Sequence, residues 1–324
     1  MNILGIETSC DETAASVVKN GKIVLSNIVV SSLKEHQKYG GVIPEIASRR
    51  QLECLNKDIT QSLSEAHLKL ADIDRVAVTV SPGLIGSLLV GISFARALSF
   101  AIKKPLIEMD HIHAHLYANF LIDRRNTRSI NKNAALTDLP AVGLVVSGGH
   151  TSLYAIKNFK HFKLLGQTRD DAAGEAFDKV AKILNLGYPG GPAIDHLAKN
   201  VEKSKLQFPC AELKNNFDFS FSGIKTSVLY HQRDPQKNKN FSVAQVAFAF
   251  QNSLVEVLVK KSIATCQQLK NKILLVGGGV AANSRLRKRL IEECERQDIK
   301  VYFPPISLCM DNAAMIAGLA YHFR

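Results

Sequence analysis

The segment DHIHAHLYANF, residues 110–120, carries three histidines at alternate positions, and histidine is the commonest metal ligand among the side chains. Residues four apart lie on one face of an α-helix, so His111 and His115 can reach a single ion. His113 is turned about 200° around the helix from His111 and cannot join them. A strand would place all three on one face, but the Ala-Leu-Tyr-Ala-Asn continuation favours a helix.

A metal site needs a further ligand, and the segment CMDNAAMIAG offers Asp311 directly before a helix of small residues. Two histidines and one aspartate with open positions suit iron or zinc and leave room for substrate oxygens. A carboxylate at a helix start is also an ordinary N-cap. The residues alone leave both interpretations open.

A metallopeptidase of the HExxH type also places two histidines four residues apart, with the glutamate as general base. Ile112 stands at the position of that glutamate in this chain. The peptidase interpretation therefore lacks its base unless a distant carboxylate serves. A lone HxxxH pair is also common by chance, so other parts of the sequence must decide.

Two segments repeat one pattern, ILGIETSCDETAASVVKNGKIV near the start and AVGLVVSGGHTSLYAIKNFKHFKLLG from Ala141. Each is a β-rich run, a tight turn of small polar residues and a second β-rich run, which predicts a hairpin. Such turns expose backbone N–H groups that bind anions. Two of these hairpins, one opening each half, suggest a phosphate held between two lobes.

Strands and helices alternate along the rest of the chain, which indicates an α/β architecture. Residues 45–68 predict a helix, and residues 71–104 predict a strand, a Pro-Gly turn and a long buried helix. A chain of 324 residues is expected to form two lobes. We place the N-terminal lobe at residues 1–121, an exposed connection at 122–139 and the C-terminal lobe at 140–310, with the helix after Asp311 packing back on the first lobe.

The segment KILLVGGGVAANSRLRKRL predicts a strand from Ile273 to Val276, three glycines and then a helix. Glycine lets the backbone approach a ligand closely, and a helix start after a strand can bind an anion or a nucleotide. A tight strand-to-helix turn is the plainer interpretation. The pattern is not GxGxxG, so a Rossmann dinucleotide site is disfavoured.

The formal net charge is +12, from 41 Lys and Arg against 29 Asp and Glu. The excess gathers in DRRNTRSINKNA, KNFKHFK, DPQKNKN and RLRKRL, which suits a polyanionic partner as well as mere solubility. Six scattered cysteines without a CxxC pair disfavour a zinc knuckle and a disulfide framework. No apolar run approaches the ~18 residues that cross a bilayer, and no targeting segment opens the chain, so we expect a cytoplasmic protein without a membrane anchor.

Ten motifs occur along nearly the whole chain in the order seen in one enzyme family. They are GIETSCDET, GGVIPEIASR, SPGLIGSLLVG, HIHAH, VVSGGHTSL, DDAAGEAFDKVAK, YPGGP, FSFSGIKT, VGGGVAANSRLR and CMDNAAMIAG. The chain therefore resembles the tRNA N6-adenosine threonylcarbamoyltransferases, the TsaD family, once described as O-sialoglycoprotein endopeptidases. The resemblance implies an α/β fold of the actin-like, sugar-kinase and Hsp70 type (ASKHA), with two lobes and a duplicated ribonuclease H-like core.

The same resemblance implies the reaction. Threonylcarbamoyl-adenylate, made by a separate enzyme, donates its threonylcarbamoyl group to N6 of the adenosine 3′ of the anticodon in tRNA, and AMP is released. Bacterial members act with TsaB and TsaE, so TsaB-like and TsaE-like proteins are the expected partners. The expected cofactor is one divalent metal ion, Fe2+ before Zn2+.

The resemblance also assigns residues to roles. The metal ligands fall on His111, His115 and Asp311, and the acidic residues that the family needs for activity fall on Asp11 and Glu12. The nucleotide and substrate contacts fall on Val145, Val146, Ser147, Gly148, Gly149, Asp178, Gly191, Asp195 and Asn283.

Each of these residue types suits its assigned chemistry. The Ser-Gly-Gly turn would donate N–H groups to a phosphate, and the aspartates 178 and 195 would accept from ribose or threonyl hydroxyls. Gly191 would let the chain pass close to the nucleoside, and Asn283 would hold the adenine. Asp11 is the candidate for orienting or deprotonating the attacking amine.

The chain departs from the common family pattern at two places. The histidine motif reads HIHAH where HMEGH is more frequent, which keeps both ligands and adds His113. The basic connection around residues 124–137 is longer than in many bacterial relatives, and it either touches tRNA or a partner, or is an exposed loop.

Three other functions compete with the transferase. They are an ATP-dependent kinase or ATPase of the same fold, a metallopeptidase, and a scaffold that binds nucleotide without catalysis. The kinase leaves His111 and His115 unexplained, because kinases of this fold hold magnesium mainly through carboxylates and water.

Overall fold

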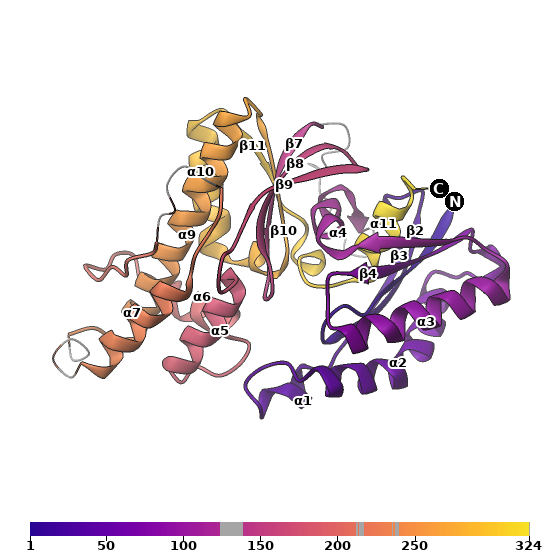
Figure 1. Cartoon of the computed structure of the whole chain (residues 1–324), viewed down its shortest axis with the longest axis horizontal. Coiled ribbons are helices and arrows are strands. Elements are labelled where there is room, and N and C mark those ends of the chain that lie inside the picture. Colours follow the sequence, from indigo (N-terminus) through magenta and orange to yellow (C-terminus); the bar gives the residue numbers. More distant parts are fainter. Residues whose placement is uncertain (124–138, 212, 214–216, 235, 237–239, 324) are drawn as a thin grey trace. The chain divides into compact units, whose positions relative to one another are not determined.

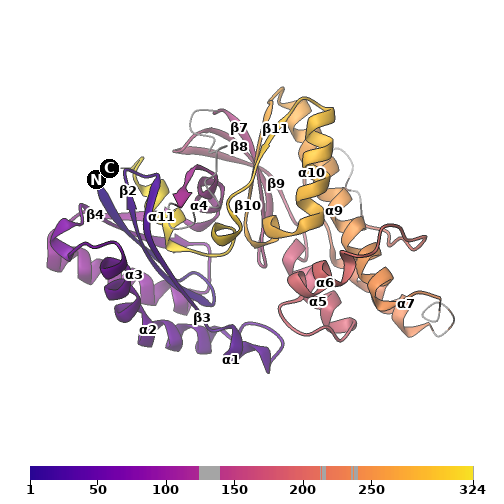
Figure 2. The same ribbon diagram turned by 180° about the vertical axis from the view of Figure 1, so that it is seen from behind.

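A computed structural model describes residues 1–123, 139–211, 213, 217–234, 236 and 240–323. The chain divides into two compact units, which we call unit 1 (Met1–Thr137 with Pro304–Arg324) and unit 2 (Asp138–Phe303). The predicted connection at residues 122–139 falls mostly outside the described residues, and so does the basic segment 124–137. Each unit is an α/β structure built on one sheet (Figures 1 and 2).

Unit 1 contains a six-stranded sheet in the order β5-β4-β1-β2-β3-β6. Strands β1, β2 and β3 form an antiparallel meander, and β4 and β5 follow in parallel on the other side of β1. The first hairpin predicted from the sequence is therefore β1–β2. The strands are β1 Asn2–Glu7, β2 Glu12–Lys19, β3 Ile23–Ser31, β4 Arg75–Ser81, β5 Leu106–Asp110 and β6 Ile122–Asp123.

Unit 2 repeats this topology in a five-stranded sheet, β11-β10-β7-β8-β9. Strands β7, β8 and β9 again form an antiparallel meander, and β10 and β11 add in parallel beside β7. The repeated hairpin pattern of the sequence thus marks a duplicated fold. The strands are β7 Ala141–Val146, β8 Thr151–Asn158, β9 His161–Gln167, β10 Ile273–Gly277 and β11 Lys300–Tyr302.

The helices pack on these sheets within each unit. Those of unit 1 are α1 Leu33–Gln37, α2 Pro44–Glu65, η1 Leu70–Asp72, α3 Ile85–Ile102, α4 His111–Tyr117, η2 Ala118–Phe120, η5 Ile306–Leu308 and α11 Ala313–Ala320. Those of unit 2 are α5 Ala173–Ile183, α6 Gly190–Ala198, α7 Ser222–Arg233, α9 Val243–Gln268, η4 Gly279–Ala282 and α10 Ser284–Arg296. The C-terminal helix α11 packs on β1, β2 and α4 of unit 1.

Strand β1 decides which helices lie on which face of the unit 1 sheet. Leu4 and Ile6 are fully buried in one apolar cluster with residues of α2 and α3. Successive residues of a strand point to opposite faces, so Gly5 and Glu7 point toward α11 and α4. A Cβ atom on Gly5 would collide with the backbone oxygen of Ala313 in α11. Glycine here lets α11 lie directly against the strand, and Glu7 faces the region where α4 begins.

Helix α3 is long and apolar enough to cross a membrane by length and composition. The sequence prediction that no run approaches this length therefore underestimated α3, in which Arg96 is the sole charged residue. Its small residues Ser87, Gly91 and Ala95 are buried, whereas Ile85 and Phe100 are 78% and 87% exposed. Length and composition are weak evidence for a span, since helices of soluble proteins pass the same test.

Replacing Gly5 by alanine tests the contact between β1 and α11. The added methyl group must push α11 away from the sheet, so we expect a loss of about 1–3 kcal/mol of stability and a lower melting temperature. Gly41→Ala is the matched control, because a Cβ atom there meets no atom within 4 Å. Equal melting temperatures for the two variants, measured by differential scanning calorimetry, would show that the contact does not constrain α11.

Candidate functional site

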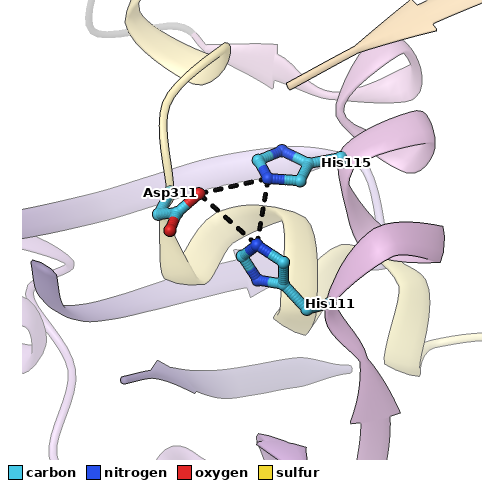
Figure 3. A group of neighbouring side chains, drawn as sticks. All are labelled: His111, His115 and Asp311. Atoms are coloured by element: carbon cyan, nitrogen blue, oxygen red, sulfur yellow. Dashed lines mark hydrogen bonds and ion pairs between the residues drawn. The ribbon is translucent and has the colours of Figure 1, made fainter. Parts of the chain in front are cut away.

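The two histidines with ligand spacing lie on α4, which begins directly after β5. The side chain of Asp110 caps this helix by accepting a hydrogen bond from the His113 N–H at 2.8 Å. His111 is therefore the first helical residue, and His115 follows one turn later. Both imidazoles are buried, whereas His113 is partly exposed. The helix expected from the sequence forms, and it sends His111 and His115 to the same side (Figure 3).

Asp311 reaches the histidines from the segment between η5 and α11. The N-cap of α11 is Asn312, whose side chain accepts a hydrogen bond from the Met315 N–H at 3.0 Å. The alternative interpretation, in which Asp311 is only the N-cap of this helix, is therefore wrong, because the N-cap is the next residue, Asn312. Its carboxylate lies instead beside the two imidazoles, as Figure 3 shows.

The three side chains present their donor atoms to one small space. His115 Nε2 lies 3.1 Å from His111 Nε2 and 3.1 Å from Asp311 Oδ1, and His111 Nε2 lies 3.5 Å from the same oxygen. Ligands about 2.1 Å from a common ion are about 3.0 Å apart at right angles and about 3.4 Å apart at the tetrahedral angle. The observed separations fit both geometries, so His111, His115 and Asp311 could hold a metal ion.

Glu7 orients His111 through Nδ1, the ring nitrogen that does not face His115 and Asp311. Its carboxylate lies 3.0 Å from His111 Nδ1, and it accepts hydrogen bonds from the Thr79 hydroxyl and the Ser9 N–H, both at 2.5 Å. A carboxylate on Nδ1 keeps the proton there and leaves the Nε2 lone pair for an ion. The sequence prediction missed Glu7, although the alternation of β1 from the buried Ile6 places it on this face.

The titratable groups of this cluster shift one another's pKa values. Burial alone would lower the pKa of His111, but the carboxylates of Asp311 and Glu7 raise it to about 9. Burial alone would raise the pKa of Glu7, but the contact with His111 lowers it instead. Burial and the charge on His111 lower the pKa of His115. Without an ion, one proton on His111 therefore balances part of the carboxylate charge, and a divalent cation can take over this role.

Asp11 and Glu12 lie in unit 1 near the same cluster. Burial, followed by the carboxylates of Asp311 and Asp11, raises the pKa of Glu12 well above its usual value. The backbone oxygen of Asp11 accepts hydrogen bonds from the N–H and the hydroxyl of Ser32, which fixes the turn after β1. Of the two acidic residues singled out from the sequence, Glu12 thus interacts with Asp311, and Asp11 is a neighbour of Glu12.

The second group of predicted residues lies in unit 2, around the turn between β7 and β8. The N–H of Ser147 donates to the His150 oxygen at 2.8 Å, and the His150 N–H donates to the Ser147 hydroxyl at 3.1 Å. Gly148 and Gly149 form the exposed tip of this turn. Val145 and Val146 are fully buried strand residues, so they can approach a ligand through backbone atoms alone.

The glycines around this turn are of two kinds. A Cβ atom on Gly174 would lie 2.6 Å from the Ser147 oxygen, and one on Gly190 would lie 2.6 Å from the Phe177 oxygen. These glycines bring α5 against the turn and α6 against α5. In contrast, an added Cβ atom would meet no other atom within 4 Å at Gly148, Gly149 or Gly191. Packing within the chain does not require glycine at these three positions, which leaves open space where a ligand can approach the backbone.

The three polar residues predicted for the same site hold its helices together. Asp178 of α5 accepts from the Gly190 N–H at 2.7 Å. Asp195 of α6 accepts from the N–H and the hydroxyl of Ser284, at 3.1 and 2.8 Å. Asn283 caps α10 and donates to Gln251 at 2.9 Å. The predicted residues thus form two groups, one in each unit.

Known protein structures share this fold. The chain is similar over 99% of its length to HypF in a phosphate- and nucleotide-bound form, with a TM-score of 0.64 and 14% identity, over 46% of that chain. It is likewise similar to the ROK hexokinase of Thermus thermophilus, with a TM-score of 0.51 and 18% identity, covering 99% of this chain and 97% of the other. The chain thus has an α/β fold of the ASKHA type, and the predicted fold class is confirmed.

Sequence relatives give the family within this class. The family model described as tRNA N6-adenosine threonylcarbamoyltransferase, TsaD, matches residues 23–318. Proteins with this name from Syntrophomonas wolfei subsp. wolfei and Clostridium botulinum (strain Hall) are 49% and 48% identical, over 99% of this chain and 92% of theirs. The chain belongs to the tRNA N6-adenosine threonylcarbamoyltransferase family, and tRNA is the substrate that this activity implies.

Metal titration tests the candidate ligands and Glu7 separately. We expect His111→Ala, His115→Ala and Asp311→Ala to remove stoichiometric binding of a divalent ion, since each takes away one donor. Glu7→Gln keeps the side-chain shape but not the charge, and we expect affinity to fall by about 10–100-fold. Isothermal titration calorimetry with Zn2+ measures both effects.

His113→Ala is the matched control, because it removes a histidine of the same helix that lies outside the cluster. Its affinity for the ion should equal that of the parent protein. Unchanged binding in all three ligand variants would contradict the assignment.

The open glycines of unit 2 give a second prediction. Gly149→Ala should leave the melting temperature unchanged but weaken binding of AMP by about tenfold, because a methyl group enters space beside the anion-binding turn. Gly174→Ala should instead lower the melting temperature, because its Cβ atom meets the backbone of the turn. Equal AMP affinity in Gly149→Ala and the parent protein would show that the phosphate of AMP does not bind at this turn.

Proposed function

We propose that this protein transfers the threonylcarbamoyl group from threonylcarbamoyl-adenylate to N6 of the adenosine 3′ of the anticodon in tRNA. The N6 nitrogen attacks the carbamoyl carbon, the bond from that carbon to the phosphate oxygen breaks, AMP leaves with the electron pair and N6 gives up one proton. The exocyclic amine is a poor nucleophile because its lone pair is delocalised into the purine. The reaction therefore needs an activated acyl group and a positioned base.

The observation that carries the proposal is the cluster of His111, His115 and Asp311 in a chain of this family. We assign these residues to one divalent metal ion, Fe2+ before Zn2+. A bound ion of this kind supplies Lewis-acid polarisation of acyl-phosphate oxygens and offsets charge on the departing phosphate. The separations of the donor atoms suit octahedral and tetrahedral ligands alike, so the preference for iron rests on the family resemblance.

Asp11 and Glu12 are the proposed acid–base residues. Asp11 accepts the proton of the attacking amine or orients it, since its side chain contacts Glu12, which in turn interacts with Asp311. Glu12 has a raised pKa and so can donate a hydrogen bond as a carboxylic acid. The two neighbouring acids would then have different roles.

The turn residues of unit 2 are the proposed phosphate and nucleoside contacts. The backbone N–H groups of Gly148 and Gly149 lie at an exposed tip and can donate to a phosphate. Asn283 uses its amide oxygen on the Leu286 N–H and one amide hydrogen on Gln251, which leaves the second hydrogen for an acceptor on adenine. Asp178 and Asp195 can accept from hydroxyls with their remaining lone pairs.

The proposal also fixes the expected partners and place of action. A separate enzyme supplies the adenylate, and TsaB-like and TsaE-like proteins support turnover. A protein that modifies tRNA in this way would act in the cytoplasm. No observation on the described residues favours a kinase or a peptidase, and Ile112 is a buried apolar residue where a peptidase needs its glutamate.

A reconstituted transfer assay tests this function. The protein is mixed with threonylcarbamoyl-adenylate, unmodified tRNA and the TsaB-like and TsaE-like partners, and modified adenosine is measured by mass spectrometry. The parent protein should form it and release one AMP per modification. The rate of the double variant His115→Ala/Asp311→Ala should fall by at least about 100-fold, because the loss of a single group that stabilises the transition state typically costs that much.

His113→Ala should retain the parent rate in the same assay, because its imidazole is outside the cluster. An inactive parent protein with active partners would refute the transferase assignment. A double variant with full activity would refute the role of the metal cluster while leaving the transferase assignment in place.

A further inference from the structure

We infer that the β8–β9 hairpin of unit 2 is a contact surface for the phosphate backbone of tRNA. The inference rests on the proposed function, because it takes tRNA as the substrate. It concerns the segment KNFKHFK, residues 157–163, which runs from the last residues of β8 through the turn into β9. The residues assigned above to metal, phosphate and nucleoside do not include any part of it.

The hairpin stands out among the basic segments because two of its lysines, Lys157 and Lys163, are exposed and form no ion pair with another described residue. The segments DRRNTRSINKNA and DPQKNKN lie largely outside the described residues. In RLRKRL of α10, Arg285 donates to Asn252, Arg287 to the Ala281 oxygen and Arg289 to Glu256 and Glu292. These three arginines therefore serve the packing of unit 2.

Two lysines of the hairpin, Lys157 and Lys163, make no such contact within the part of the chain that the structure describes. Lys157, Lys160 and Lys163 are exposed, as is His161. Among the residues that the structure describes, no ion pair joins Lys157 or Lys163 to a carboxylate. The sequence from Ala141 to Thr168 contains no Asp or Glu, so no acidic residue of the meander itself offsets the charge of these lysines. Uncompensated lysines on an exposed surface attract a polyanion.

The place of the lysines in the fold excludes the nucleotide itself as their partner. Strand β8 starts beside the Ser-Gly-Gly turn at Thr151 and ends at Asn158. Its eight residues span roughly 25 Å at 3.3 Å per residue. A nucleotide at the turn does not extend to Lys157 at the far end of β8, whereas a polymer that continues from the target nucleoside can reach both Lys157 and Lys163, which pairs with Ala155.

The sheet leaves this side of the hairpin open. Strand β9 is an edge strand of the unit 2 sheet and pairs with β8 on its inner side. Its last residues are covered by the segment around Phe219, which bonds to the Gln167 oxygen. On the side away from β8, the residues from His161 to Leu165 have no further strand among the described residues. A duplex with its shallow groove and regular phosphates can approach such an open edge.

A protective role is the main alternative, because lysines on an edge strand also prevent pairing with other chains. Charge reversal separates the two roles. Glutamate blocks edge-to-edge pairing as well as lysine does, but it repels phosphate. The double variant Lys157→Glu/Lys163→Glu should therefore stay monodisperse and keep its melting temperature while its affinity for tRNA falls.

The matched control is Lys270→Glu/Lys300→Glu. Both lysines are exposed, and Lys300 begins β11, the opposite edge of the same sheet. The two double variants change the net charge equally. Any difference between them therefore reports the position of the charge and not its amount.

Fluorescence anisotropy with unmodified tRNA over a series of salt concentrations measures the effect on the full-length protein. For the hairpin variant we expect the dissociation constant to rise about tenfold and the slope of log K against log salt to fall by about 1 per lysine. In the transfer assay its KM for tRNA should rise while kcat stays at the parent value. The control variant should match the parent in all three quantities.

Two outcomes overturn the inference: equal affinity and salt slope in the hairpin variant and the parent protein, or equal losses in the hairpin and control variants. Failure of the proposed function looks different. A parent protein that binds tRNA through the hairpin but transfers nothing with active partners would refute the transfer chemistry and leave the contact surface in place.

Discussion

The burial of three titratable side chains beside a partly buried fourth, at one point of unit 1, is the constraint on which this site depends. Glu7, His111 and His115 are withdrawn from water and Asp311 is partly exposed, and charged groups in such a place are costly unless they are paired. The contact of Glu7 with His111 and of Asp311 with both imidazoles supplies that pairing. A divalent cation would complete it, since its two charges match the two carboxylates and leave both imidazoles neutral.

The topology of unit 1 brings these residues together from distant parts of the chain. Glu7 ends the first strand, the histidines follow the fifth strand, and Asp311 arrives with the segment that returns from unit 2. The close approach of α11 to Gly5 sets the position of that returning segment. A change in the packing of α11 would therefore displace Asp311 even if every ligand residue were kept.

Much of this arrangement could be predicted from the sequence because it follows local rules. The spacing of His111 and His115 fixed their common face, and two similar hairpin patterns indicated a repeated fold, which both sheets show. Other features depend on contacts that no local pattern encodes. The role of Asn312 as N-cap depends on a one-residue shift of the helix start, and the hydrogen bond from His111 to Glu7 depends on how β5 and β1 are ordered in the sheet. The polar residues of unit 2 were recognised as a set, but their mutual support through Gly190, Ser284 and Gln251 became visible only in three dimensions.

Anomalous X-ray diffraction from crystals of the native protein tests the central claim most directly. The account predicts one anomalous peak, about 2.0–2.2 Å from the two histidine nitrogens and the aspartate oxygen that face each other in unit 1. Data collected on both sides of the iron and zinc absorption edges would identify the element. Fully occupied side chains at His111, His115 and Asp311 with no anomalous peak between them, in metal-replete protein that is active in tRNA modification, would contradict it.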